Sequence, residues 1–327
     1  MKVVKILLPL AALCTAFVLV SAFAESVPNE KVILINKFVD HPALDETARG
    51  IIDALADAGF AEGKTATVRV ESAQASAALA SQISNKFANQ SPDVVICIGT
   101  VSAQSMAKYA NAGTAKVIFS SITDPVGAGL VKNLDETGGN ISGVSNFVSL
   151  EPQLELMKKF QPRLKKLGII YNAGEMNSLS IVEKLNAVAG QFGLKIVTQA
   201  VIKTSDVPQA ATRLASTVDA IFISNDNTAL SCLPSIVHVC NSVGIPVYVS
   251  DTDAIGLGAL AALGPNQYAV GRQTGEMAAK VLNGASIATL PVEFPTTMEL
   301  VVNAAAARFL RIIIPQSVFS SATRILP

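Results

Sequence analysis

Short apolar runs alternate with amphipathic stretches along most of this chain. The runs are brief, continuous and rich in β-branched residues, which is typical of strands buried on both faces. The stretches between them carry apolar residues at helical spacing. The first half therefore predicts a β-α-β-α-β-α-β order around a parallel sheet. Its predicted strands are Lys31–Asn36, Thr65–Glu71, Val94–Ile98 and Lys116–Ser120, and its predicted helices are Leu44–Gly59, Ala77–Asn89 and Ser102–Ala112.

The second half repeats this plan, so the sequence predicts an α/β protein of two Rossmann-like lobes with parallel sheets. Its predicted strands and helices are Lys166–Tyr171, Ser178–Phe192, Lys195–Ala200, Val207–Ser216, Ala220–Ser224, Ala229–Val243, Pro246–Ser250 and Gly271–Leu282. Ile141–Asn146, Ala262–Pro265 and Glu299–Asn303 are expected to cross between the lobes as a three-strand hinge. Residues 30–143 plus 266–298 would form the first lobe, and residues 144–265 plus 299–327, with a short C-terminal helix, the second.

The first 24 residues have the pattern of a secretory signal peptide. Two lysines precede an apolar run from Ile6 to Val20, and Ala22-Phe23-Ala24 is a small-x-small cleavage site. The run of about 15 residues is short of the roughly 20 that a membrane anchor needs. Lipidation at Cys14 is disfavoured because a bulky leucine precedes it. We therefore expect cleavage near Ala24 and a mature protein in the periplasm.

The composition of the chain excludes some classes of function. The chain has 25 basic and 25 acidic side chains, so nothing in its charge indicates nucleic-acid binding. It is 50% hydrophobic and only 15% charged, which excludes a disordered solvating chain. Cys97, Cys232 and Cys240 follow the signal segment. Their odd number is a poor disulfide framework, and no metal site is expected because no His or Cys completes a four-ligand set.

Polar clusters follow five of the predicted strands. They are 99–104, 120–125, 172–178, 225–228 and 251–253. Parallel sheets bind ligands beyond the carboxyl ends of their strands, so five clusters in this position on both lobes indicate one cleft. Gly99 would allow a tight turn, and the hydroxyls of Thr100 and Ser102, with the free N–H groups of the helix start, would suit a carboxylate or phosphate. Alternatively, either hydroxyl could serve merely as the cap of the helix. The second lobe would add amides and acids that suit an ammonium.

Residues for catalysis are not evident. The chain has two histidines: His41 follows a strand and could line the cleft, and His238 is expected to pack or lie on the surface. No G-x-S-x-G nucleophile elbow occurs, and Gly256-Leu257-Gly258 lacks the context of a dinucleotide fingerprint. Asp251 and Asp253 alone are weak support for a divalent cation. We therefore predict a binding site without chemistry: no enzyme and no cofactor.

Several segments together resemble the substrate-binding proteins of ABC transporters with the type I periplasmic-binding fold. Within that group, the chain is most similar to the branch associated with tryptophan and tyrosine uptake. The likeness covers nearly all of the mature chain. The segments that carry it are Val39–Asp45, Gly99–Gln104, Phe119–Val131, Ile141–Asn146, Ile170–Asn172, Asn225–Leu230 and Ala262–Pro265. The chain departs from the family at Arg311, which stands where a glycine is usual at a left-handed turn.

The resemblance implies a ligand held between two lobes that close around it. It assigns the ligand carboxylate to Thr100, Ser102 and Ala103, with Ser121 nearby. It assigns further polar contacts to Asn146, Asn177, Asn225 and Asp251, and Asp251 is the candidate partner of an ammonium. The expected ligand is an aromatic amino acid, tryptophan or tyrosine, and the expected partner is an ABC permease that receives it from a monomeric binding protein.

Three alternatives remain open. The chain could be the ligand-sensing partner of a signalling receptor, an enzyme on a two-lobe scaffold, or a binder of another solute such as a sugar. The sugar interpretation is less favoured because sugar sites usually stack aromatic rings on the ligand, and this chain has no Trp and four Tyr. A transcriptional repressor is not expected, because a signal segment stands where DNA-binding helices would be.

Overall fold

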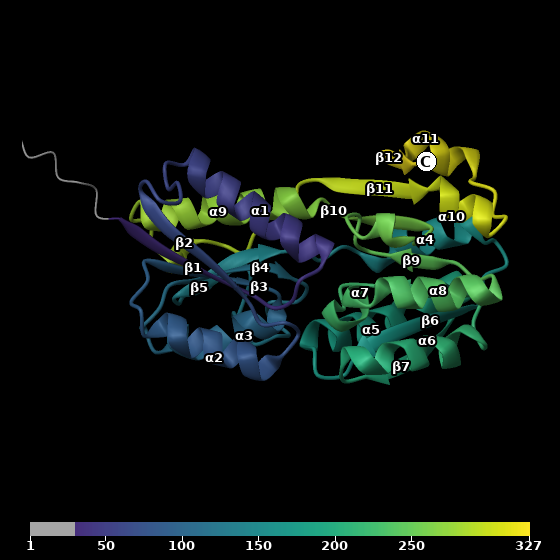
Figure 1. Ribbon diagram of the computed structural model, residues 1–327, viewed down its shortest axis with the longest axis horizontal. Helices are drawn as coiled ribbons and strands as arrows, with labels where there is room; N and C mark the ends of the chain where they lie inside the picture. The colour runs from purple at the N-terminus through teal and green to yellow at the C-terminus, as the bar shows by residue number, and fades with distance from the viewer. Residues whose placement is uncertain (1–29) are drawn as a thin grey trace, which may run out of the picture.

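The computed structural model describes residues 30–327 and shows two α/β lobes lying side by side (Figure 1). The predicted signal peptide, residues 1–24, lies outside the described residues. Within residues 30–327, none of the helices combines the length and apolar character that a membrane crossing requires. The predicted fold class, two Rossmann-like lobes with parallel sheets, is confirmed.

The first lobe is built on a five-stranded parallel sheet with helices on both faces. Its strands lie in the order β2 (Ala66–Ser72), β1 (Lys31–Lys37), β3 (Val94–Ile98), β4 (Val117–Ile122) and β5 (Ile141–Ser145). Helices α1 (Pro42–Asp57) and α9 (Gln267–Leu282) pack together on one face, and α2 (Ala77–Ala88) and α3 (Thr100–Asn111) cover the other (Figure 1). The 3₁₀ turn Ile287–Thr289 completes this lobe. Parallel pairing places the carboxyl ends of β1, β3 and β4 at one edge of the sheet.

The second lobe contains a seven-stranded sheet, in which only the β10–β11 pair is antiparallel. Its strand order is β12 (Arg324–Leu326), β11 (Met298–Asn303), β10 (Ala261–Pro265), β9 (Val247–Val249), β8 (Ala220–Ile223), β6 (Lys166–Asn172) and β7 (Lys195–Val201). Its helices are α4 (Leu150–Phe160), α5 (Met176–Ala189), α6 (Val207–Ala215), α7 (Asn227–Ser231), α8 (Leu233–Val243), α10 (Ala304–Phe309) and α11 (Gln316–Ser321), with 3₁₀ turns at Gly190–Phe192, Thr204–Asp206 and Ile255–Leu257.

Alternation along the strands of the second lobe divides its core between the two faces of the sheet. Ile221 and Ile223 of β8 pack against α6, α7 and α8. Phe222 of the same strand, with Tyr248 of β9, packs against α4 and α5 on the opposite face. Because side chains alternate across a strand, a strand with apolar residues at every position requires helices on both faces. The continuous apolar runs in the sequence thus dictate the layered architecture.

One predicted helix of the second lobe differs from the structure, and two observed elements of that lobe were not predicted. The predicted helix Ala229–Val243 is two helices separated at Cys232, because Pro234 lacks the N–H that a continuous helix would need at that position. Helix α4 is absent from the prediction, although Leu150, Leu154 and Met157 have helical spacing and are buried. The short strand β12 is also absent from the prediction.

The chain passes between the two sheets at three places. It leaves the first sheet after β5, returns after β10 into α9, and enters the second sheet again at β11. These are the three predicted hinge crossings, and β10 and β11 lie next to each other where the lobes join (Figure 1). The predicted boundary at residue 143 falls inside β5, which lies wholly in the first sheet. The lobe limits themselves stay a prediction.

Arg311 adopts the left-handed conformation that its position requires. It follows the C-cap Leu310 of α10 and has φ 55°, a region that costs an L-residue about 1–2 kcal/mol. Arg311→Gly removes this strain, and the gain exceeds the extra entropy glycine has in the unfolded chain. We expect the free energy of unfolding in urea to rise by about 0.5–1 kcal/mol.

Arg308→Gly is the matched control, because Arg308 lies within α10, where glycine costs about 1 kcal/mol. The two arginine-to-glycine changes should therefore shift the urea midpoint in opposite directions. A lower midpoint for Arg311→Gly would show that the arginine side chain contributes more than its backbone strain costs.

Candidate ligand-binding site between the lobes

A small polar cavity lies between the two lobes, where the carboxyl ends of strands from both sheets meet. First-lobe residues and hinge residues form one side, and loops of the second lobe form the other. The lining residues are His41, Ala43, Leu44, Thr100, Ser121, Thr123, Asn146, Asn177, Asn225, Asn227, Leu230, Asp251 and Gln267. Most of these side chains are buried, so polar atoms among them that have no protein partner are available to a ligand.

The N-terminus of α3 forms the first-lobe wall of the cavity. Gly99 has φ 92°, and a Cβ at this position would lie 3.2 Å from the Cβ of Phe38, so the tight turn into α3 requires glycine. Thr100 follows it with 1% exposure, and its Oγ1 has no hydrogen-bond partner among the described residues. The N–H groups of the first helical turn lack intrahelical acceptors and carry the positive end of the helix dipole. Together they suit a carboxylate or another anion.

Ser121 is directed into the same region by an irregularity in β4. Its φ is 56°, and the pairing of β4 with β5 shifts register between Ser120 and Ile122. The Ser121 hydroxyl donates to Oε1 of Gln267 at 3.0 Å, and the Thr47 hydroxyl, which donates to the carbonyl of Ala43, lies 3.3 Å from the same oxygen. Since Oε1 of Gln267 accepts from Ser121, the amide N–H groups of Gln267 point away from these two hydroxyls.

His41 lies at the start of α1 and is buried, with 6% exposure. Its Nε2 lies 3.3 Å from Oδ1 of Asn227 in the other lobe, and its Nδ1 has no partner among the described residues. Burial lowers the pKa of the imidazole to about 4. His41 is therefore neutral at pH 7, so one ring nitrogen is a donor and the other an acceptor.

Glu175 organises the second-lobe wall from behind. It is the N-cap residue of α5 and is 1% exposed. Its two carboxyl oxygens accept from the backbone N–H groups of Asn227 and Thr228, from the Thr228 hydroxyl, and from the side-chain amides of Asn172, Asn177 and Asn227. Glu175 belongs to a polar cluster in the sequence but was not predicted as a site residue. Its contacts with α7 join residues 52 and 53 positions apart along the chain, which the sequence pattern does not show.

Asp251 supplies the carboxyl group that lines the cavity directly. It follows β9, is 3% exposed, and accepts a hydrogen bond from the N–H of Asp253 at 3.0 Å. Burial, with a smaller contribution from the negative charge of Asp253, raises the pKa of Asp251 to about 7. A buried acid without a cation beside it is partly protonated near neutral pH, and a ligand cation would draw it into the charged form.

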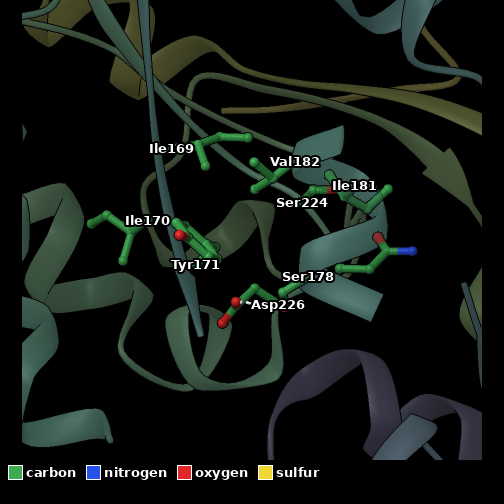
Figure 2. A pocket seen from close by; sticks show the side chains of 9 residues that line it. Ile169, Ile170, Tyr171, Ser178, Ile181, Val182, Ser224 and Asp226 are labelled. Atoms are coloured by element: carbon green, nitrogen blue, oxygen red, sulfur yellow. Dashed lines mark hydrogen bonds between the residues drawn. The ribbon is translucent and has the colours of Figure 1, made fainter. Parts of the chain in front are cut away.

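A second, mainly apolar pocket lies within the second lobe between β6, β8 and α5, and meets the cavity at Asn225. Figure 2 shows Ser178 and Asp226 at one end of this pocket and Ile169 and Val182 at the other. The Ser178 hydroxyl donates to Oδ2 of Asp226 at 2.7 Å. Burial and the nearby Glu175 carboxylate raise the pKa of Asp226. Asp226 also caps α7 through Ala229, so its role is to shape the loop that carries Asn225 and Asn227.

Three sets of contacts hold the lobes together across the cavity. Nδ2 of Asn225 donates to Oδ1 of Asn146 at 3.1 Å, and His41 contacts Asn227.

The third set lies at the edge of the cavity, where Oδ2 of Asp124 accepts from the Ser180 hydroxyl at 2.8 Å and from Nζ of Lys184 at 2.7 Å. Burial alone would raise the pKa of Asp124, but bonds from Lys184, the Gly127 N–H and Ser180 outweigh it and lower the pKa. The lobes are therefore in contact in this structure.

Six of the eight residues assigned from the sequence line the cavity, and two do not. The six are Thr100, Ser121, Asn146, Asn177, Asn225 and Asp251. The Ser102 side chain turns into the first lobe, where its hydroxyl donates to Oδ1 of Asn36 at 3.1 Å. Ala103 is fully buried, and its N–H donates to the carbonyl of Gly99 within the helix.

Several lining residues were not assigned from the sequence. Asn227 lies in the polar cluster 225–228, and Gln267 closely follows the predicted hinge segment Ala262–Pro265, so their positions were available as signals. Leu44 and Leu230 were hidden within predicted helices, where an apolar residue usually packs into a core. Only the apposition of the lobes shows that these two leucines face a shared cavity.

Two lobes in contact across a cavity, with polar atoms from each that have no partner within residues 30–327, are typical of a two-lobed binding protein. The chain belongs to the ABC transporter substrate binding protein family, whose model matches residues 32–326. A tyrosine-binding protein of Clostridioides difficile is 35% identical over 275 residues, covering 84% of this chain and 79% of that protein.

Two solved structures differ in how closely they match. The ABC domain from Streptococcus pneumoniae in complex with L-Trp has 35% identity and a TM-score of 0.87, covering 91% of this chain and all of that chain. The ligand-free, open structure of a substrate-binding protein from Clostridium difficile has 33% identity but a TM-score of only 0.68, covering 90% and 99%. Identity and coverage are nearly equal, so the difference indicates that the lobes here are arranged more like those of the ligand complex.

Proposed function

We propose that the mature protein is the periplasmic, monomeric binding component of an ABC importer and carries an aromatic amino acid, tyrosine or tryptophan, to a membrane permease. It acts as a carrier with no chemical step and no cofactor. Residues 1–24 serve as its cleaved signal peptide. Family membership supports the permease partner, and the two relatives whose names or complexes include tyrosine and L-Trp support the ligand class.

The observation that carries this proposal is that both walls of the cavity carry polar atoms without a partner in the described part of the chain. Thr100 and the N-terminus of α3 provide donors for a carboxylate, with Ser121 nearby. Asp251 and Oδ1 of Asn177, also without a partner among the described residues, provide acceptors for an ammonium on the other side. A zwitterion thus satisfies both lobes at once, and the closed arrangement gains contacts that an open one lacks.

The ligand side chain is proposed to contact Leu44 and Leu230, the two leucines that line the cavity from opposite lobes. Burying an aromatic side chain removes about 150–250 Å² from water. At about 25 cal/mol/Å², this contributes roughly 4–6 kcal/mol before the cost of association. Together with the charge-assisted hydrogen bonds, this is sufficient for micromolar or tighter binding.

The proposal is tested by calorimetric titration of the mature protein, residues 25–327, against the twenty amino acids and a panel of sugars. We expect saturable binding of tyrosine or tryptophan at micromolar Kd or below. The chain has no Trp, so added tryptophan is the only indole present and its emission reports binding independently. Tighter binding of a sugar than of either amino acid, or no binding of any compound in the panel, would contradict the proposed ligand class.

The contact between Asp124 and Lys184 is expected to add modestly to ligand affinity by favouring the closed arrangement. Both side chains are partly exposed, at 25% and 40%, so the pair contributes at most about 1 kcal/mol. Lys184→Ala should therefore raise the Kd for tryptophan about two- to fivefold at low salt, and the difference should diminish in 1 M NaCl. Lys195→Ala, which removes an exposed lysine with no ion pair among residues 30–327, should leave the Kd unchanged. An unchanged Kd for Lys184→Ala at low salt would remove this contact from closure.

A further inference from the structure

The six donors around Glu175 fix the direction of two amides in the binding cavity. Three donors point at each carboxyl oxygen, so Glu175 is surrounded as an acceptor only. Nδ2 of Asn227 lies 2.6 Å from its Oε2, and Nδ2 of Asn177 lies 3.2 Å from the same oxygen. Turning either amide over would place its oxygen against the carboxylate, which is unfavourable.

The orientation of Asn227 determines the tautomer of His41. With Nδ2 of Asn227 held by Glu175, its Oδ1 faces the other lobe, 3.3 Å from Nε2 of His41. An amide oxygen only accepts, so Nε2 of the neutral ring must carry the proton. The other nitrogen, Nδ1, is then a bare acceptor, and it is the nitrogen that has no partner among the described residues.

The side-chain amide of Asn177 is also oriented by Glu175, through contacts that do not involve His41. Its Nδ2 donates to Glu175 and, at 2.7 Å, to the carbonyl of Asn225, so the amide nitrogen is fully used on the protein side. Its Oδ1 is left without a partner within residues 30–327, although the residue is 2% exposed and lines the cavity. Glu175 thus leaves acceptor atoms, not donors, free on both His41 and Asn177.

We propose that Glu175 is a positioning residue that makes the cavity selective for a ligand with an ammonium group. It holds Nδ1 of His41 and Oδ1 of Asn177 as acceptors in the cavity that the carboxyl group of Asp251 also lines. An ammonium has three N–H groups, and the cavity then offers three acceptors, two neutral and one acidic. This inference rests on the proposed amino-acid ligand for its second half only, because the tautomer of His41 is a property of the ligand-free protein.

The first experiment measures that tautomer directly. The ¹⁵N chemical shifts of the imidazole nitrogens distinguish Nε2–H from Nδ1–H, and the chain has only two histidines, so His238→Gln leaves His41 alone in the spectrum. At pH 7 we expect the Nε2–H form in the ligand-free protein. Glu175→Gln, which places an N–H group among the donors, and Asn227→Ala, which breaks the relay but keeps Glu175, should each shift the population toward Nδ1–H.

Asn225→Ala is the matched control, because Asn225 lines the same cavity but its side chain bonds Asn146 and not the Glu175 carboxylate. It should leave the tautomer unchanged. Finding His41 as Nδ1–H or as imidazolium in the wild type would overturn the inference. So would an unaltered tautomer ratio in Asn227→Ala, a variant that stays interpretable even where Glu175→Gln fails to fold.

The second experiment separates positioning from general damage to the site. Tryptophan and indole-3-propionate, which lacks the ammonium, are titrated into the wild type and Glu175→Gln. We expect the Kd for tryptophan to rise at least tenfold and that for indole-3-propionate to change less than threefold. Equal losses for both compounds would mean a merely structural role. If the wild type does not bind tryptophan, the proposed function fails, and the tautomer measurement still decides whether Glu175 sets the state of His41.

Discussion

Replacing Asp251 by Asn is expected to weaken ligand binding tenfold to a hundredfold while making the ligand-free protein more stable. The binding loss follows because Asp251 is the acidic group that lines the cavity, at 3% exposure, and Asn cannot neutralise a buried ammonium. Breaking a buried charge pair by removing one partner costs about 3–5 kcal/mol, and the amide recovers part of this as a neutral hydrogen bond.

The gain in stability follows from the raised pKa of Asp251. Burial moves this pKa from 3.8 to about 7, so the folded state disfavours the charged carboxylate that the unfolded chain prefers. The penalty is present in full above pH 7 and disappears below about pH 4, where both states are protonated. At pH 8 it amounts to at most about 4 kcal/mol, from 1.36 kcal/mol per pKa unit. Asp251→Asn removes it, so the free energy of unfolding should rise at pH 8 and change little at pH 4.

Calorimetry for binding and urea unfolding at pH 4 and pH 8 check the two halves of this prediction. Wild-type affinity should also fall up to about tenfold per pH unit below pH 7, because the ligand must displace the proton on Asp251. Asp251→Asn should abolish that slope. Asp253→Asn is the control for the loss of binding and should still bind the ligand, since Asp253 does not line the cavity and its charge makes the smaller contribution to the raised pKa of Asp251. Unchanged affinity in Asp251→Asn would remove this residue from the site.

Replacing Gly264 by Ala is expected to cause a large loss of stability. Gly264 lies in β10, and a Cβ on it would stand 1.7 Å from the backbone carbonyl oxygen of Ser250. Backbone cannot rotate away as a side chain can, so β9 and β10 must separate. We expect a loss of about 3 kcal/mol or more in the free energy of unfolding. Because Asp251 directly follows Ser250, the displacement should also weaken ligand binding.

Gly256→Ala provides the comparison for this change. Gly256 lies in the 3₁₀ turn Ile255–Leu257 of the same lobe, and nothing lies within 4 Å of an added Cβ. Urea unfolding should show a large fall in the midpoint for Gly264→Ala and a shift within about 0.5 kcal/mol for Gly256→Ala. A small effect at Gly264 would mean that the hinge strand can move without breaking the sheet.

Much of the fold could be predicted because it is local. The buried strands are apolar at every position, as Val94–Ile98 shows, and that pattern requires covered faces whatever the rest of the chain does. The alternation of strands and helices, and the three crossings, followed from segment order. The predicted helix Ala229–Val243 was wrong at Cys232. A proline two residues later separates it into two helices, although the apolar spacing continues across the break.

The polar clusters after the strands were also visible from the sequence, and Thr100, Asn177, Asn225 and Asp251 of these clusters line the cavity. The direction of individual side chains was not visible. Each residue along a helix rotates the side-chain direction by about 100°. Ser102 lies two residues beyond Thr100, so its side chain lies on another face of α3 and points to Asn36. A polar residue in the right loop can therefore still point into its own lobe.

By itself, the sequence determined most of the strands and helices, the order in which the chain passes between the lobes, and which loops carry polar groups, because these depend on neighbours a few positions away. Only the tertiary structure decided the hydrogen-bond partners and protonation of those polar groups. The use of the Glu175 carboxylate by Asn177 and Asn227, the unpaired Nδ1 of His41 among the described residues and the pKa of Asp251 depend on atoms brought together from distant parts of the chain. Burial and partner geometry, which are long-range properties, set the chemistry of residues whose positions the local pattern had already fixed.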